Sequence, residues 1–365
     1  MPKPSHVEDV FLNYNPEAPQ ARFKAAKVPG ALIEKASDRL PSAVPWPAGH
    51  APKAAPLKTA PAQTDDLTKF QGYDAVVVTW TAAEAATLAS LFTPGYLTSA
   101  WYEYRHNIDT YIPLVTGRTA PFNDSSEEEA RYYHSLGLYF PCTIGNARVL
   151  VVKSGLHLDY DGPATPVKKL MAEIASAVQP KIFITTGTGG GIGADVALGD
   201  VVIAGQTQFF CTTQFANEPW KAAVYKTTAV PAAALKEITP ALTSVNAKKV
   251  PGAHPSPTIW SAPTDTIVTT DFFGFDDSTD HDKLQGPGHR ACDMGDAMVG
   301  QALQPFTSKL KWFAIRNASD PQIPNPNNNI EAASKEASNI YSKYGAFTTA
   351  ASVIASWAII DSIIN

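Results

Sequence analysis

Residues 181–205 read KIFITTGTGGGIGADVALGDVVIAG, and this stretch decides the fold. Its first part, Ile182 to Thr186, is a short run of apolar and β-branched residues, which is typical of a buried strand. Four glycines follow within residues 187–191 and predict a sharp turn that a ligand can approach closely. Residues 201–204 predict a second strand. Open α/β sheets place ligand sites where such strands end, although composition alone also allows a purely structural turn.

The composition indicates a folded chain with one large core. Of the 365 residues, 44% are hydrophobic and 17% are charged, which is enough to bury a sizeable apolar interior. The formal net charge is -5, so the chain lacks the basic excess that neutralises a phosphate backbone. We therefore expect no nucleic-acid partner.

Cysteine usage and apolar patterning bear on redox state and location. Cys142, Cys211 and Cys292 are widely spaced, which argues against a disulfide framework or a thiolate metal site. The acidic loop at 276–282 lacks the spacing of a calcium or zinc site, so we expect no metal. The N-terminal residues show no signal-peptide pattern, and no apolar run reaches the length of a membrane span. A cytoplasmic protein without a membrane partner is expected.

The chain divides into two zones. Residues 1–70 are rich in proline and alanine, as in the stretch PWPAGHAPKAAPLKTAPAQ, and predict a mostly irregular arm. Residues 71–365 predict one catalytic domain. Strand and helix patterns alternate at its start, which predicts a layered α/β sheet. The expected strands are 75–79, 146–153, 182–186, 265–270 and 310–316, and the expected helices are 81–92, 165–178, 231–238 and 331–364.

Polar side chains follow several of the expected strands. Because strand ends can converge on one crevice, we expect them to share a site. An aromatic residue such as Phe273 and the soft side chain of Met294 suit a planar ring and a sugar, although both types also pack in ordinary cores. Two carboxylates beside such a ligand fit cleavage of an N-glycosidic bond. The polar candidates are Glu84, Ser154, Thr188, Asp293, Asp296 and Asp320.

Five blocks of this sequence resemble the nucleoside phosphorylase superfamily, which includes purine nucleoside phosphorylases, AMP nucleosidase and methylthioadenosine/S-adenosylhomocysteine nucleosidase. The final helix is also similar to the purine nucleoside permease-like branch of that superfamily. The glycine-rich block is the most specific of the five. The blocks are VVVTWTAAEAATLASLF at 76–92, ITTGTGGGIGADVALGDVVIA at 184–204, VTTDFFGFDD at 268–277, CDMGDAMVG at 292–300 and FAIRNASD at 313–320.

The resemblance implies a three-layer α/β/α sandwich around a twisted mixed sheet. It also implies a homo-oligomer (a dimer, trimer or hexamer), no cofactor, and a purine nucleoside as the ligand, with phosphate as a further partner if the protein is a phosphorylase. By this resemblance Asp320 protonates the departing base, and Glu84 activates a water with help from Ser154. The substrate-binding residues that it implies are Thr188, Gly189, Gly190, Phe273, Asp293, Met294, Asp296, Arg316 and Ser319.

Two departures from the family pattern matter. Gly295 follows Met294 where the family has a glutamate that holds the sugar hydroxyls, so a charged acceptor is missing. Asp293 or Asp296 takes over its role, the sugar lacks that hydroxyl, or the site no longer turns over. The segment after the first strand also lacks the arginine of the phosphorylases, which favours water as the nucleophile. Three hypotheses therefore stand: a nucleosidase, a phosphorylase, and a non-catalytic nucleoside-binding or storage protein.

Overall fold

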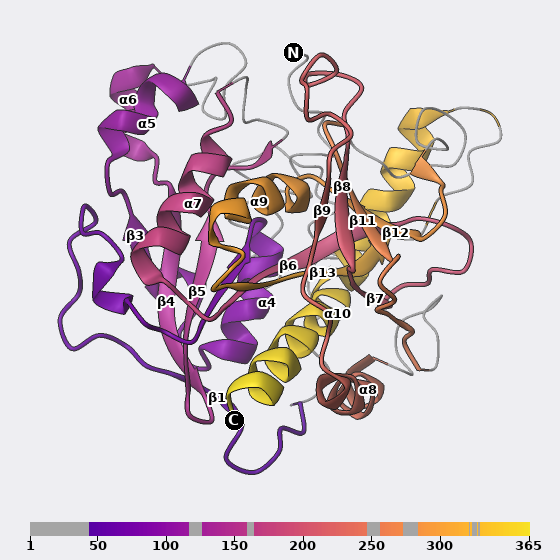
Figure 1. Ribbon diagram of the computed structural model, residues 1–365, viewed down its shortest axis with the longest axis horizontal. Helices are drawn as coiled ribbons and strands as arrows, with labels where there is room; N and C mark the ends of the chain where they lie inside the picture. Colours follow the sequence, from indigo (N-terminus) through magenta and orange to yellow (C-terminus); the bar gives the residue numbers. More distant parts are fainter. Residues whose placement is uncertain are drawn as a thin grey trace.

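The fold was analysed in a computed structural model (Figure 1). The structure describes residues 44–116, 126–158, 164–246, 256–272, 284–320, 322, 327 and 329–365.

One mixed sheet forms the centre of the molecule (Figure 1). Its middle is parallel: β2 (Ala75–Thr79) lies between β5 (Ala147–Ser154) and β6 (Ile182–Gly191), and β13 (Lys311–Asp320) also pairs with β6. Because these four strands run the same way, their C-terminal ends meet at one edge of the sheet. That edge carries the polar residues that the sequence singled out.

Further strands extend the sheet on both sides of this centre. On one side β4 (Gly137–Ile144) pairs antiparallel with β5 and also joins β1 (Pro52–Ala54) and β3 (Tyr102–Tyr104). The other side holds β12 (His289–Asp293), β11 (Thr266–Thr270), β8 (Gln206–Phe210), β9 (Val224–Lys226), β7 (Val201–Ile203) and β10 (Ile259–Trp260).

Helices cover both faces of the sheet, which confirms the expected three-layer sandwich (Figure 1). Alternate residues of β2 show why its whole run is apolar: Val76 and Val78 pack into one core, and Ala75 and Val77 into the other. The first core includes α7 (Pro166–Val178) and α9 (Asp296–Leu303), and the second includes α4 (Ala82–Phe92), α8 (Ala232–Asn246) and α10 (Ile330–Ile364). Two short helices, α5 (Ile108–Val115) and α6 (Glu127–Tyr133), lie near α7.

The expected helices and strands of the catalytic domain are present within a few residues, but the glycine turn is wrong. Residues 187–191 continue β6 as extended strand and pair with β13 and β12. Glycine is needed at these positions because neighbouring groups approach the backbone closely, and not because the chain bends there. A side chain at Gly187 would collide with the Glu84 carboxylate and with Arg316, and a Cβ at Gly189 would lie 2.8 Å from the Cys292 carbonyl.

The C-terminal helix α10 packs its second half against β13 and α4. No single helix among the described residues is both long and apolar enough to cross a membrane. Lys335–Gly345 and Thr348–Ile364, bent by 56° relative to each other, reach the required length and composition only as a pair.

Within the described part of the proline-rich arm, residues 44–54 pack onto the domain, and we call this segment the N-terminal strap. Val44 is buried, and the ring of Trp46 lies 4.9 Å from that of Trp357 in α10. The backbone carbonyl of His50 accepts a hydrogen bond from Trp357 Nε1, and its ring pairs with Asp361 at 2.6 Å. The strap ends in β1, at the edge of the sheet.

Candidate active site

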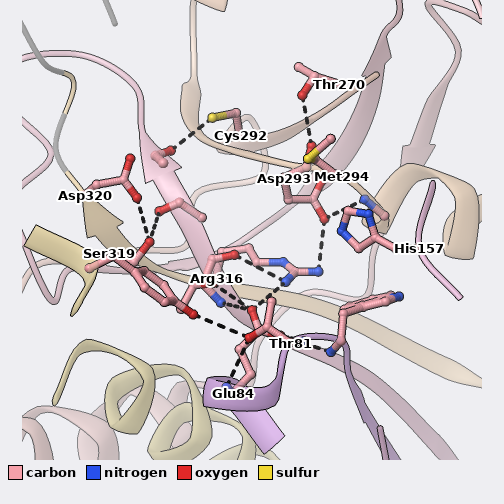
Figure 2. A pocket seen from close by; sticks show the side chains of 16 residues that line it. Thr81, Glu84, His157, Thr270, Cys292, Asp293, Met294, Arg316, Ser319 and Asp320 are labelled. Carbon is pink, nitrogen blue, oxygen red and sulfur yellow. Dashed lines mark hydrogen bonds and ion pairs between the residues drawn. The ribbon is translucent and has the colours of Figure 1, made fainter. Parts of the chain in front are cut away.

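A pocket opens at the C-terminal ends of β2, β6 and β13 (Figure 2). Its empty space is about 660 Å³, which includes the open mouth to solvent. The loop between β12 and α9 closes one wall, and α10 contributes to another. The pocket is lined by Trp80, Thr81, Glu84, His157, Thr188, Gly189, Gly190, Thr270, Cys292, Asp293, Met294, Gly295, Arg316, Ser319, Asp320 and Tyr341.

Arg316 is the electrostatic centre of this pocket. Its side chain is buried and forms a two-pronged ion pair with Asp296, with Nε and Nη2 each 2.8 Å from a carboxylate oxygen. Nη2 also lies 3.0 Å from Asp293 Oδ2, and Nη1 lies 3.8 Å from Glu84 Oε1. One guanidinium therefore pairs with three carboxylates, which come from α4, β12 and α9.

Glu84 has two roles: it caps a helix through local contacts, and it binds a strand that only the fold brings close. Locally, it forms a capping box with Thr81 at the start of α4, as its spacing predicted. Its Oε2 also accepts from the Thr79 hydroxyl and the Trp80 amide, at 2.8 and 3.0 Å. Across the sheet, Oε1 accepts from the amide and the hydroxyl of Thr188, both at 2.7 Å. The described residues thus donate five hydrogen bonds to this carboxylate.

These donors keep Glu84 ionised. Burial acts to raise the pKa of Glu84, but the Arg316 charge and the hydrogen bonds from Thr188 and Thr81 outweigh it and hold the pKa below its usual range. A carboxylate has about four lone-pair sites, so five donors leave none vacant.

Asp293 lies beside Arg316 and, like Glu84, accepts several hydrogen bonds from the protein. It accepts hydrogen bonds from the Thr269 hydroxyl at 2.6 Å and from the amides of Gly295 and Asp296. Burial, and next the charge of Asp296, raise the pKa of Asp293 to about 7. Asp296 itself is fully buried behind Arg316 and does not line the pocket.

Among the carboxyl groups that line the pocket, Asp320 accepts the fewest hydrogen bonds from described residues. It ends β13, and its Oδ1 accepts one hydrogen bond from the Ser319 hydroxyl at 2.7 Å. No described residue donates a hydrogen bond to its Oδ2. Burial raises the pKa of Asp320 to about 6, against the lowering effect of the Ser319 hydrogen bond. Figure 2 shows Asp320 and Glu84 apart on the pocket wall.

The structure brings most of the predicted site residues together, with exceptions. Ser154 does not line the pocket, and that expectation is wrong. Its hydroxyl donates to the Leu156 carbonyl at 2.7 Å and accepts from the Leu156 amide, so it stabilises the turn after β5. Phe273 and the acidic loop at 276–282 lie outside the described residues.

Several pocket residues escaped the sequence reasoning. Trp80 and Thr81 stand next to Glu84 in the same block, and Cys292 precedes Asp293, so adjacency alone could have drawn attention to them. Burial lowers the pKa of His157 to about 4, so its ring is neutral at pH 7. Tyr341 comes from α10, and its hydroxyl lies 3.4 Å from that of Thr81. Only the fold brings α10 to this site.

Comparisons with known proteins agree with this architecture. The family model described as the phosphorylase superfamily matches residues 112–345. A comparison with curated protein sequences found no match.

Solved structures share the fold at low sequence identity. One is a 5'-methylthioadenosine/S-adenosylhomocysteine nucleosidase from Helicobacter pylori, crystallised with butyl-thio-DADMe-Immucillin-A. It is 13% identical, with 80% of this chain and 99% of that chain covered and a TM-score of 0.50. Another is the futalosine hydrolase of Helicobacter pylori strain 26695, which is 13% identical over 80% of this chain and 98% of that chain, with a TM-score of 0.50. The chain belongs to the phosphorylase superfamily.

Proposed function

We propose that the pocket cleaves the N-glycosidic bond of a purine nucleoside, with water as the nucleophile. The observation that carries the proposal is the pairing of two unlike carboxyls in one pocket. Asp320 is buried with a raised pKa, and no described residue donates to its Oδ2, whereas Glu84 is held ionised by five donors. When the surroundings of two carboxyl groups push their pKa values apart in this way, one group can act as the acid and the other as the anion.

Asp320 is the proposed acid. Its pKa of about 6 keeps a substantial protonated fraction near neutral pH, and Ser319 orients the group through Oδ1. The proton passes from Oδ2 to a ring nitrogen of the purine as the bond to the sugar breaks. The base then leaves neutral, and the sugar carbon develops the oxocarbenium character that water attacks.

Thr188 is the proposed water ligand. Its hydroxyl donates to Glu84 Oε1, so its own lone pairs are left to accept a hydrogen bond from a water in the pocket. As the water attacks, its proton moves to the Thr188 oxygen while the threonine proton moves to Glu84. Glu84 then acts through Thr188, because its own lone pairs are already engaged.

The charges of the pocket favour water over phosphate. Arg316 is the one arginine or lysine among the described residues that line the pocket, and three carboxylates already neutralise it. A phosphate dianion would meet the surplus negative charge of Glu84, Asp293 and Asp296. Hydrolysis is also the reaction named for the two solved structures described above.

The test is an assay of free base release from a panel of purine nucleosides, with and without inorganic phosphate. We expect release without phosphate, and loss of at least about 100-fold in kcat for Asp320→Asn with an unchanged circular dichroism spectrum. Release that requires phosphate supports a phosphorylase instead. Tight binding without release from any nucleoside supports a non-catalytic binding protein.

A further inference from the structure

Trp80 and Gly295 form a complementary pair on one wall of the pocket. The Trp80 side chain is only 5% exposed, and the Arg316 guanidinium stacks on its ring at 4.7 Å from the ring centre. A Cβ placed on Gly295 would lie 3.2 Å from Trp80 Cζ2 and 3.4 Å from Cε2. The indole therefore fills the space that a longer side chain at 295 needs, and glycine is the residue that this packing accommodates.

The carboxylates that the structure describes on this wall are already engaged by protein donors. Glu84 accepts five hydrogen bonds from described residues, and Asp293 accepts from Thr269, Gly295, Asp296 and Arg316. Asp296 gives both oxygens to Arg316. A vicinal diol brings two hydroxyl donors, and a buried donor without an acceptor costs free energy. Among the described residues, this wall therefore offers no carboxylate with both oxygens open, which a vicinal diol would need.

What this wall does offer is an apolar surface and one donor. Trp80 Nε1 is buried, and no described residue accepts a hydrogen bond from it. Nε1 is bonded to Cε2, one of the ring atoms that a Cβ at Gly295 would approach. An indole N–H can donate but cannot accept. Together with the Met294 side chain, the wall is complementary to a sugar that is poor in hydroxyl donors and supplies one acceptor oxygen.

We propose that Trp80 and Gly295 make the pocket selective for nucleosides whose sugar lacks the vicinal diol, that is, for 2′-deoxynucleosides. This proposal rests on the function proposed above. With the base at Asp320 and the water at Thr188, the sugar lies between them, against Met294, Gly295 and Trp80. In either sugar the 3′ oxygen can accept from Trp80 Nε1, but the deoxy sugar brings one donor fewer into the pocket.

The experiment compares kcat/KM for 2′-deoxyadenosine and adenosine in the wild type and in three variants. Trp80→Ala with Gly295→Glu makes room and adds an acceptor, whereas each single change supplies only one of these. For each protein we take the ratio of kcat/KM for 2′-deoxyadenosine to kcat/KM for adenosine. The N-glycosidic bond of the deoxynucleoside is intrinsically more labile, but this effect is the same for every protein and cancels when the ratios are compared. We expect the ratio to fall by about tenfold or more in the double variant and less in either single variant.

A second measurement keeps the test decisive if the double variant does not fold. The dissociation constants of the two nucleosides are measured on Asp320→Asn, and tighter binding of 2′-deoxyadenosine is expected. Equal or reversed affinities, or an unchanged activity ratio in a folded double variant, overturn the selectivity. Base release with a preference for adenosine overturns the selectivity alone, whereas no binding and no release for any nucleoside overturn the proposed function as well.

Discussion

At the scale of single residues, burial decides the chemistry of Asp320. The carboxyl ends a core strand and receives one hydrogen bond from a described residue, so little compensates for the loss of solvent. Its pKa rises to about 6, whereas that of Glu84, equally buried but supplied with donors, falls. The number of donors around each carboxyl separates the two roles.

Asp320→Asn should change the pH dependence of stability. The pKa of about 6 in the folded state lies above the ordinary value of 3.8, so folding binds protons between these two values. The carboxyl therefore lowers stability as pH rises from 4 to 6, by on the order of 3 kcal/mol once it is ionised. Asparagine lacks this penalty. We expect the difference in stability between Asp320→Asn and the wild type, measured by thermal unfolding, to favour the variant more at pH 8 than at pH 4. The same difference at both pH values would contradict the burial argument.

Thr188→Val should separate the proposed water ligand from the strand that carries it. Valine preserves the shape and the backbone amide bond to Glu84 but removes the hydroxyl. We expect kcat for base release to fall about 100-fold with little change in KM, whereas Thr188→Ser should retain activity. Steady-state kinetics on the three proteins decides the matter. Wild-type kcat in the valine variant would remove Thr188 from the reaction.

At the scale of elements, two helices carry the same cap in different surroundings. The helix α4 begins with a buried capping box of Thr81 and Glu84, and α6 begins with an exposed one of Ser126 and Glu129. The local sequence predicts both helix starts equally well. Only the first cap also binds β6 and Arg316, which makes it part of the site.

Glu84→Gln and Glu129→Gln form a matched pair for this difference. In the first variant, the NH₂ group of the new glutamine would face the groups that donate hydrogen bonds to Glu84 in the wild type. Arg316 would also lose one of its counter-charges. We therefore expect the unfolding free energy to fall by about 3–5 kcal/mol. The change at the exposed Glu129 should leave the unfolding free energy almost unchanged. The pKa of Glu84 is lowered by folding, so its contribution is present above the unfolded pKa of about 4.3 and is lost on acidification. Urea unfolding at pH 7 and pH 3.5 measures both effects; equal losses at pH 7 would show that burial of the cap is unimportant.

At the scale of the whole molecule, the parallel strands gather the site and α10 connects it to the opposite end of the fold. Tyr341 of this helix lines the pocket, and Trp357 and Asp361 near its C-terminal end hold the N-terminal strap. Figure 1 shows the C-terminal end of α10 beside β1, at the edge of the sheet.

Trp46→Ala should loosen the strap and leave the chemistry unchanged. The half-buried indole packs on Trp357, so its loss should lower the unfolding free energy by about 1–2 kcal/mol. The kcat for base release should remain at the wild-type value because the strap does not line the pocket. Tyr132→Ala is the control: Tyr132 is 74% exposed and its loss should cost less than about 0.5 kcal/mol. Equal stability of the two variants would mean that the strap contributes nothing.

The sequence by itself determined the order of the central strands and helices, the cap of α4 and most of the residues that line the pocket. The strands, helices and cap depend on local periodicity and on residues a few positions apart, whereas many of the pocket residues were predicted through the family resemblance. The strand β4 was missed because Pro141 stands in the middle of it, and a proline argues against a strand when sequence is read alone.

Only the tertiary structure decided the state of the groups in the site. Whether residues 187–191 bend or stay extended depends on pairing with β13 and β12, which are more than 90 residues away in the chain. The commitment of Arg316 to three carboxylates and the packing of Trp80 against Gly295 also join distant segments. Hydrogen-bond saturation and pKa values follow from such contacts, because they depend on burial and on neighbours in space.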